Sequence, residues 1–178
     1  GATEGNNEPT QNFYESYNID DLRRDVSIGQ LADGRIYCKK FVKKPVLPNQ
    51  SNANFVVLRY TDVLLMYAEA LNEISYSSSG DAIKYLNEVR QRAGLQVCTS
   101  QQITGQDEFR NLIWDERRYE FAFENQRWFD LLRSGKAVEV MNKSSNGDFV
   151  VEPYQLLFPI PQNQIDIAPD VMKQNDDY

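Results

Sequence analysis

Two amphipathic segments joined by a short polar turn constrain the fold of this chain more than any other feature. Residues 59–74 carry apolar side chains at the four-, three- and four-residue spacing of a helix that buries one face. Residues 75–80 are polar and end in Gly80, and a second segment runs from Asp81 to Gly94, where the missing Cβ suits a helix C-cap. So short a connection predicts an antiparallel helical hairpin, the unit of tetratricopeptide-like repeats, in a single copy.

The remaining patterns predict a mainly α chain with small β elements. Asp107 opens a third helix that is expected to run to about residue 125, and helices follow over residues 126–133 and 136–142. Short strands are expected at residues 36–42, 149–151 and 156–158.

The length of 178 residues suits one domain with a core of its own. Residues 1–12 offer almost nothing to bury, so they are interpreted as a mobile leader or a cloning remnant. The sequence therefore predicts a single domain over residues 13–178.

The charge balance and the absence of histidine exclude several classes of function. The chain carries 19 Lys and Arg against 26 Asp and Glu, a net charge of −7, whereas a nucleic-acid partner requires a basic surface. Mechanisms that use an imidazole base or ligand are excluded because the chain has no histidine. Residues 20–44 run against the overall balance, with seven Lys or Arg and four Asp, and we interpret them as a solvated strand face.

Neither a metal nor a cofactor is expected. Cys38 and Cys98 lie far apart and form no CxxC motif, and whether they pair with each other stays open. The acidic residues of the tail lack the spacing of a calcium-binding loop. No apolar run reaches the roughly 18 residues of a membrane-spanning helix.

Two glutamates on the third helix form the one constellation that could carry chemistry. Glu116 and Glu120 are four residues apart in the middle of an apolar helix face, at a carboxylate separation close to that of a retaining glycosidase. The competing interpretation is a structural ion-pair network, because a buried unpaired charge costs several kcal/mol. The arginines available to such a network include Arg117, Arg127 and Arg59.

Three tyrosines are weak candidates for stacking on a sugar ring. Tyr14, Tyr17 and Tyr37 lie in segments typical of loops or strand edges, where a ring face can stay exposed. Ordinary packing is the competing interpretation for each of them.

Four strings of residues, in the same order, resemble motifs of the SusD/RagB family. They are LRYTDVLLMYAEALNE at 58–73, LNEVRQRAGL at 86–95, ERRYEFAFENQRWFDL at 116–131, and FPIPQ at 158–162 followed by QNDDY at 174–178. Residues 13–57 match more loosely, through Asp21–Arg24 and the Lys39-Lys40 pair. The departures lie in the tail, where Asp176-Asp177 replaces the usual Pro-Gly before the last tyrosine and Ala168 replaces an asparagine.

This resemblance implies a surface-exposed outer-membrane lipoprotein of Bacteroidetes-type bacteria. Such a protein captures an oligosaccharide or polysaccharide, or in some members a peptide, without catalysis, and delivers it to a SusC-like TonB-dependent transporter. The chain resembles the C-terminal third of the family, so the lipid anchor and most of the sugar platform are expected upstream of it. Two hypotheses compete with this one: a glycoside hydrolase that uses Glu116 and Glu120, and a helical protein-interaction module built on residues 59–94.

Overall fold

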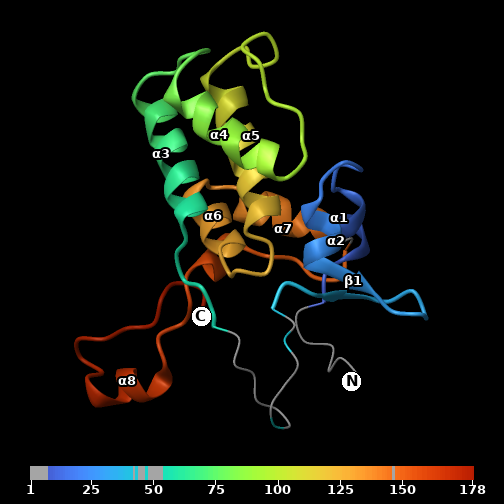
Figure 1. The fold of residues 1–178 in the computed structure, drawn as a ribbon. Coiled ribbons are helices and arrows are strands. Elements are labelled where there is room, and N and C mark those ends of the chain that lie inside the picture. Colours follow the sequence, from blue (N-terminus) through green and yellow to red (C-terminus); the bar gives the residue numbers. More distant parts are fainter. Residues whose placement is uncertain (1–7, 42, 44–46, 48–53, 146) are drawn as a thin grey trace. The chain divides into compact units, whose positions relative to one another are not determined.

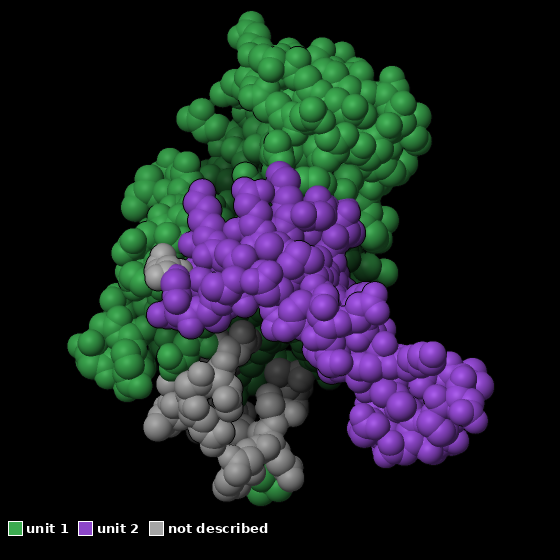
Figure 2. All heavy atoms as spheres, turned by 180° about the vertical axis from the view of Figure 1, so that it is seen from behind, with its two compact units in different colours: residues 1–126 green, residues 127–178 purple. Residues whose placement is uncertain are grey.

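The computed structural model describes residues 8–41, 43, 47, 54–145 and 147–178. It is mainly helical, with one small sheet of two strands (Figure 1). The chain divides into two compact units, residues 1–126 and 127–178, which Figure 2 distinguishes by colour. The sequence predicts a single domain over residues 13–178, whereas the structure has a unit boundary after Gln126.

Helices α3, Tyr60–Ile74, α4, Asp81–Arg92, and α5, Gln106–Glu120, build the main core of the first unit. The predicted hairpin is confirmed as α3 and α4, and both helices pack against α5 (Figure 1). Their facing side chains form the main apolar core, whose most deeply buried members are Leu65, Ala68, Leu86, Phe109 and Ile113. In the described part of the chain, no helix has both the length and the apolar character needed to cross a membrane.

The end of α4 holds the N-terminal segment in place. Gly94 has a φ of +80°, which confirms the predicted C-cap, and a Cβ added there would lie 2.9 Å from Cγ of Leu22. The amide of Leu22 donates a hydrogen bond of 3.0 Å to the carbonyl of Ala93. This contact fixes the start of the segment that carries Arg23.

The N-terminal segment contributes short elements to the first unit. They are α1, Gln11–Glu15; α2, Arg23–Ser27; β1, Ile28–Gln30; and β2, Ile36–Cys38. The strands are antiparallel, with Gly29 opposite Tyr37. The strand predicted over residues 36–42 ends early, at Cys38, and residue 42 lies outside the described residues. Residues 1–7 of the predicted leader lie outside them too, and α1 begins within its last two residues.

Helix α5 ends at Glu120, five residues before the predicted end. Phe123 and Asn125 both have a positive φ, of 66° and 60°, which a continuing α-helix does not allow. The carbonyl of Glu120 accepts hydrogen bonds from Lys40 Nζ at 2.7 Å and from Arg59 Nη2 at 2.9 Å. Cations from distant segments therefore satisfy the end of the helix, where its dipole favours positive charge.

The second unit contains α6, Arg127–Arg133; α7, Ala137–Ser144; a 3₁₀ turn, η1, Pro153–Leu156; and α8, Gln162–Ile167. The two strands predicted at 149–151 and 156–158 are wrong. The side-chain amide of Asn142 accepts from Val151 N at 2.6 Å and donates to Val151 O at 3.0 Å, so a side chain takes the place of a partner strand.

The C-terminal turn keeps a left-handed residue although the family glycine is absent. Asp177 has a φ of 69°. Next to it, the hydroxyl of Tyr178 donates a hydrogen bond of 2.8 Å to the carbonyl of Leu157. Asp177 thus takes a backbone conformation in which a glycine would be less strained.

Candidate functional site

Glu116 and Glu120 are joined by one arginine that the sequence reasoning did not include. Both side chains are 2% exposed, and Arg23 Nη1 donates to Glu116 Oε1 at 2.6 Å and to Glu120 Oε2 at 3.0 Å. The other two nitrogens of the Arg23 guanidinium donate to Asp21, Nε to Oδ1 at 2.8 Å and Nη2 to Oδ2 at 2.7 Å. The signals that could have found Arg23 are its place in the string Asp21–Arg24 and the local basic excess.

Every carboxylate oxygen of this pair accepts from an arginine. Glu116 Oε2 accepts from Arg90 Nη1 at 3.0 Å, and Glu120 Oε1 accepts from Arg59 Nη1 at 2.6 Å. Arg92 Nη2 makes a further ion pair with Glu120 Oε1. The two glutamates are therefore the centre of a network whose cations come from α2, α4 and the segment before α3.

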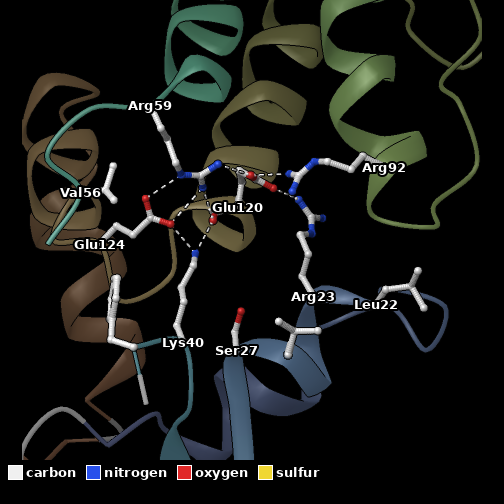
Figure 3. Close-up of a pocket in the computed structure, with 11 residues that line it drawn as sticks. Leu22, Arg23, Ser27, Lys40, Val56, Arg59, Arg92, Glu120 and Glu124 are labelled. Carbon is white, nitrogen blue, oxygen red and sulfur yellow. Dashed lines mark hydrogen bonds and ion pairs between the residues drawn. The ribbon is translucent and has the colours of Figure 1, made fainter. Parts of the chain in front are cut away.

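Glu124 adds a fourth carboxylate to Asp21, Glu116 and Glu120. Glu124, which is 6% exposed, accepts from Arg59 Nε at 2.8 Å and pairs with Lys40 (Figure 3). The guanidinium of Arg59 also lies 4.6 Å from the centre of the Phe121 ring. Residues 120–124 are thus held in place by cations from two other segments.

Arg117 and Arg127 are the other arginines predicted for the network. Arg117, which is 4% exposed, donates to Asp62 Oδ1 of α3 at 2.6 Å. Arg127 is the first residue of α6, in the second unit, and its role in the network stays a prediction.

The network sets the ionisation of Glu120. Burial alone would raise the pKa of this carboxyl, but the hydrogen bond and charge of Arg59, together with Arg23 and Arg92, lower it to about 2. Burial lowers the pKa of Lys40, against the effect of its hydrogen bond to Glu124. Glu120 is therefore ionised at neutral pH and holds no proton that a general acid could donate.

The network borders an open cavity of about 410 Å³ in the first unit (Figure 3). Its charged floor contains Arg23, Lys40, Arg59, Arg92, Glu120 and Glu124. The rest of the lining is Leu22, Val26, Ser27, Phe41 and Val56. Residues 20–44 thus supply cations to a buried network as well as to the surface, so the interpretation of this segment as a solvated strand face is wrong for Arg23 and Lys40.

Of the tyrosine candidates, Tyr17 is buried, which favours ordinary packing over stacking on a sugar. Its residue is 5% exposed, and its hydroxyl donates to the carbonyl of Tyr119 at 3.3 Å. Tyr14 is half-buried and has the guanidinium of Arg24 at 5.3 Å from its ring centre. Tyr37 is half-buried as well, and stacking by these two rings stays a prediction.

The described residues contain no group of three or more His, Cys, Asp or Glu side chains placed to hold a metal ion. Cys38 and Cys98 are both free thiols, which answers the question of their pairing.

Solved structures of the SusD superfamily share the fold of this chain. A SusD superfamily protein from Parabacteroides distasonis has a TM-score of 0.79 and 31% identity to this chain, covering 96% of it and 42% of that structure. The surface glycan-binding protein A from Bacteroides uniformis has a TM-score of 0.78 and 28% identity to this chain. The match covers 93% of this chain and 40% of that structure.

The SusD family model matches residues 2–178, and the chain belongs to this family. The SusD-like protein P2 of Formosa agariphila is 30% identical in an alignment 208 residues long that covers 96% of this chain and 40% of the relative. The chain thus spans about 40% of the length of this relative.

Proposed function

We propose that this chain takes part in non-catalytic binding of a glycan at the bacterial cell surface. The observation that carries the proposal is its likeness to the surface glycan-binding protein A, with a TM-score of 0.78 over 93% of the chain. Membership of the SusD family supports the same class of function.

The arrangement of Glu116 and Glu120 supports a role without catalysis. A retaining glycosidase needs one protonated carboxyl group and a second carboxylate with an oxygen free to attack the sugar. Here both oxygens of each glutamate accept from arginines, and Glu120 has a pKa of about 2. The pair therefore serves better as an anchor for three segments than as an acid and a nucleophile.

The partner and the location follow from the family. In this proposal the whole protein is an outer-membrane lipoprotein, and it delivers its ligand to a SusC-like TonB-dependent transporter. Co-purification of the whole protein with such a transporter from outer membranes tests this part of the proposal.

A second candidate function, a helical protein-interaction module, is favoured by one face of α3. Tyr60, Val63, Tyr67 and Ile74 lie on one side of this helix and are exposed. If this face binds a second copy of the chain, light scattering will show a dimer that a Val63→Asp variant abolishes. A monomer at high concentration would contradict this candidate.

Binding and turnover measured on the same glycans test the main proposal. The 178-residue chain is titrated calorimetrically with a panel of polysaccharides, and released reducing ends are assayed in the same samples. The proposal predicts saturable binding to at least one glycan without release of reducing ends. Release that is lost in Glu116→Gln and Glu120→Gln variants would favour the hydrolase, and absence of any binding would contradict the proposal for this chain.

A further inference from the structure

The cavity beside the ion-pair network has polar groups that the network does not use. We propose that this cavity binds the anionic group of an acidic saccharide, that is, one carrying a carboxylate or a sulfate. The inference rests on the proposed glycan-binding function and specifies the class of glycan.

The charges around the cavity leave one cation in excess. Among the described residues, the cations of the connected network are Arg23, Lys40, Arg59, Arg90 and Arg92. Its carboxylates are Asp21, Glu116, Glu120 and Glu124. A local positive charge in a chain of net charge −7 attracts an anion and is stabilised by one.

Arg92 is the member of the network that can bind a ligand. Its side chain is 56% exposed, and only Nη2 is engaged, with Glu120. Its Nε and Nη1 donate to none of the residues that the structure describes. Because Glu120 Oε1 also accepts from Arg59, the fork of Arg92 can hold a carboxylate or sulfate while Glu120 stays paired.

Ser27 supplies a second unused group. The residue is 3% exposed and lines the cavity, and Figure 3 shows its hydroxyl directed toward the charged floor. This hydroxyl makes no hydrogen bond with any residue in the described part of the chain. The hydroxyl faces the cavity, and a sugar hydroxyl can bond to it because each can both donate and accept.

The aliphatic wall of the cavity favours an anionic group that is attached to a sugar ring. Leu22, Val26 and Val56 line it and are 64%, 66% and 41% exposed, which leaves aliphatic surface for the C–H face of a sugar ring. The volume of about 410 Å³ falls within the range of small-molecule sites. An inorganic anion would use Arg92 alone, and a neutral sugar would leave the excess charge unmatched.

Calorimetry with matched saccharides tests the inference. The 178-residue chain is titrated at low salt with trigalacturonate, a hyaluronan tetrasaccharide and a sulfated carrageenan disaccharide, and with neutral maltotriose and inorganic sulfate as comparisons. We expect at least one acidic saccharide to bind at least tenfold more tightly than maltotriose and sulfate, with an affinity that falls as salt is added. If inorganic sulfate binds as tightly as the acidic saccharides, the cavity is a site for a free anion, and the inference that it binds a saccharide is overturned.

Two variants and a matched control locate the site. Arg92→Gln should weaken the acidic saccharide at least tenfold, and Ser27→Ala should weaken it several-fold. Neither should change the melting temperature, since Arg92 is redundant at Glu120 and the Ser27 hydroxyl has no partner among the described residues. Arg35→Gln is the control, because Arg35 is 61% exposed, pairs with one carboxylate and lies outside the cavity lining.

The outcomes separate this inference from the proposed function. Unchanged affinity in Arg92→Gln, or neutral glycans that bind while all three acidic saccharides fail, would overturn the inference and leave glycan binding standing. Absence of binding by every glycan, acidic and neutral, would overturn both.

Discussion

Replacing Glu120 by glutamine tests the ion-pair network at its centre. The substitution keeps the size of the side chain but removes the charge that pairs with Arg23, Arg59 and Arg92. Removing one partner of a buried ion pair costs about 3 to 5 kcal/mol, because the other charges stay buried without compensation. For a chain of this size that loss lowers the melting temperature by roughly 10 °C.

The pH dependence gives the same magnitude by a separate argument. The pKa of Glu120 falls from an ordinary value of 4.5 to about 2 in the folded chain, a difference that corresponds to about 3 kcal/mol. Because the folded pKa is the lower one, this stabilisation is complete above pH 4.5. It is lost as the pH falls from 4.5 toward 2, where the folded chain also takes up the proton.

The assay is urea unfolding followed by far-UV circular dichroism, between pH 7 and pH 2.5. Glu120→Gln should lose about 3 kcal/mol or more at pH 7, and the difference from the unmodified chain should shrink below pH 4.5. Glu88→Gln, at an exposed carboxylate on α4, should change stability by less than about 0.5 kcal/mol. A loss below about 1 kcal/mol in Glu120→Gln, or a loss that does not depend on pH, would refute this account of the network.

Three further substitutions test the packing around the site and the tail. Gly94→Ala should destabilise the chain by about 2 kcal/mol in urea unfolding, because φ is +80° and the added Cβ lies 2.9 Å from Leu22. Gly105→Ala is the control, since a Cβ there has no atom within 4 Å. Equal losses of stability in the two variants would contradict the close contact at Gly94. Tyr17→Phe should cost about 1 kcal/mol through its lost hydrogen bond, and a loss of glycan affinity at unchanged stability would instead make Tyr17 a ligand contact. Asp177→Gly should slow hydrogen exchange in the C-terminal turn and stabilise it by up to about 1 kcal/mol, and faster exchange would contradict strain at φ 69°.

The parts of the fold that depend on local patterns could be predicted from the sequence. The spacing of apolar residues and the C-cap glycine placed α3 and α4 to within a residue or two, because both signals lie inside the segment that they describe. The predicted buried face of α3 was wrong, since Val63, Tyr67 and Ile74 at that spacing are exposed and the neighbouring Leu64, Leu65 and Ala68 are buried. The end of α5 was missed because Lys40 and Arg59, distant in sequence, bond to its last carbonyl. The two strands predicted in the tail do not form, and at residues 149–151 the side chain of Asn142 bonds to Val151 in place of a partner strand.

In the site too, local patterns could be predicted from the sequence and contacts between distant residues could not. The helical spacing of Glu116 and Glu120 predicted that they share a face and need cationic partners, and Arg59 is such a partner. Arg23 is 93 residues from Glu116, so only the folded chain reveals their contact. The Ser27 hydroxyl, which has no partner among the residues that the structure describes, gives no signal in the sequence, since a serine near a turn is usually solvated.

Native mass spectrometry of the chain with a bound oligosaccharide tests the central claim, glycan binding without cleavage, most directly. The account predicts a complex whose mass equals that of the chain plus the intact oligosaccharide, and that dissociates to unmodified protein and unchanged ligand. A covalent sugar adduct on Glu116 or Glu120, shortened oligosaccharides, or no complex with any glycan would contradict it.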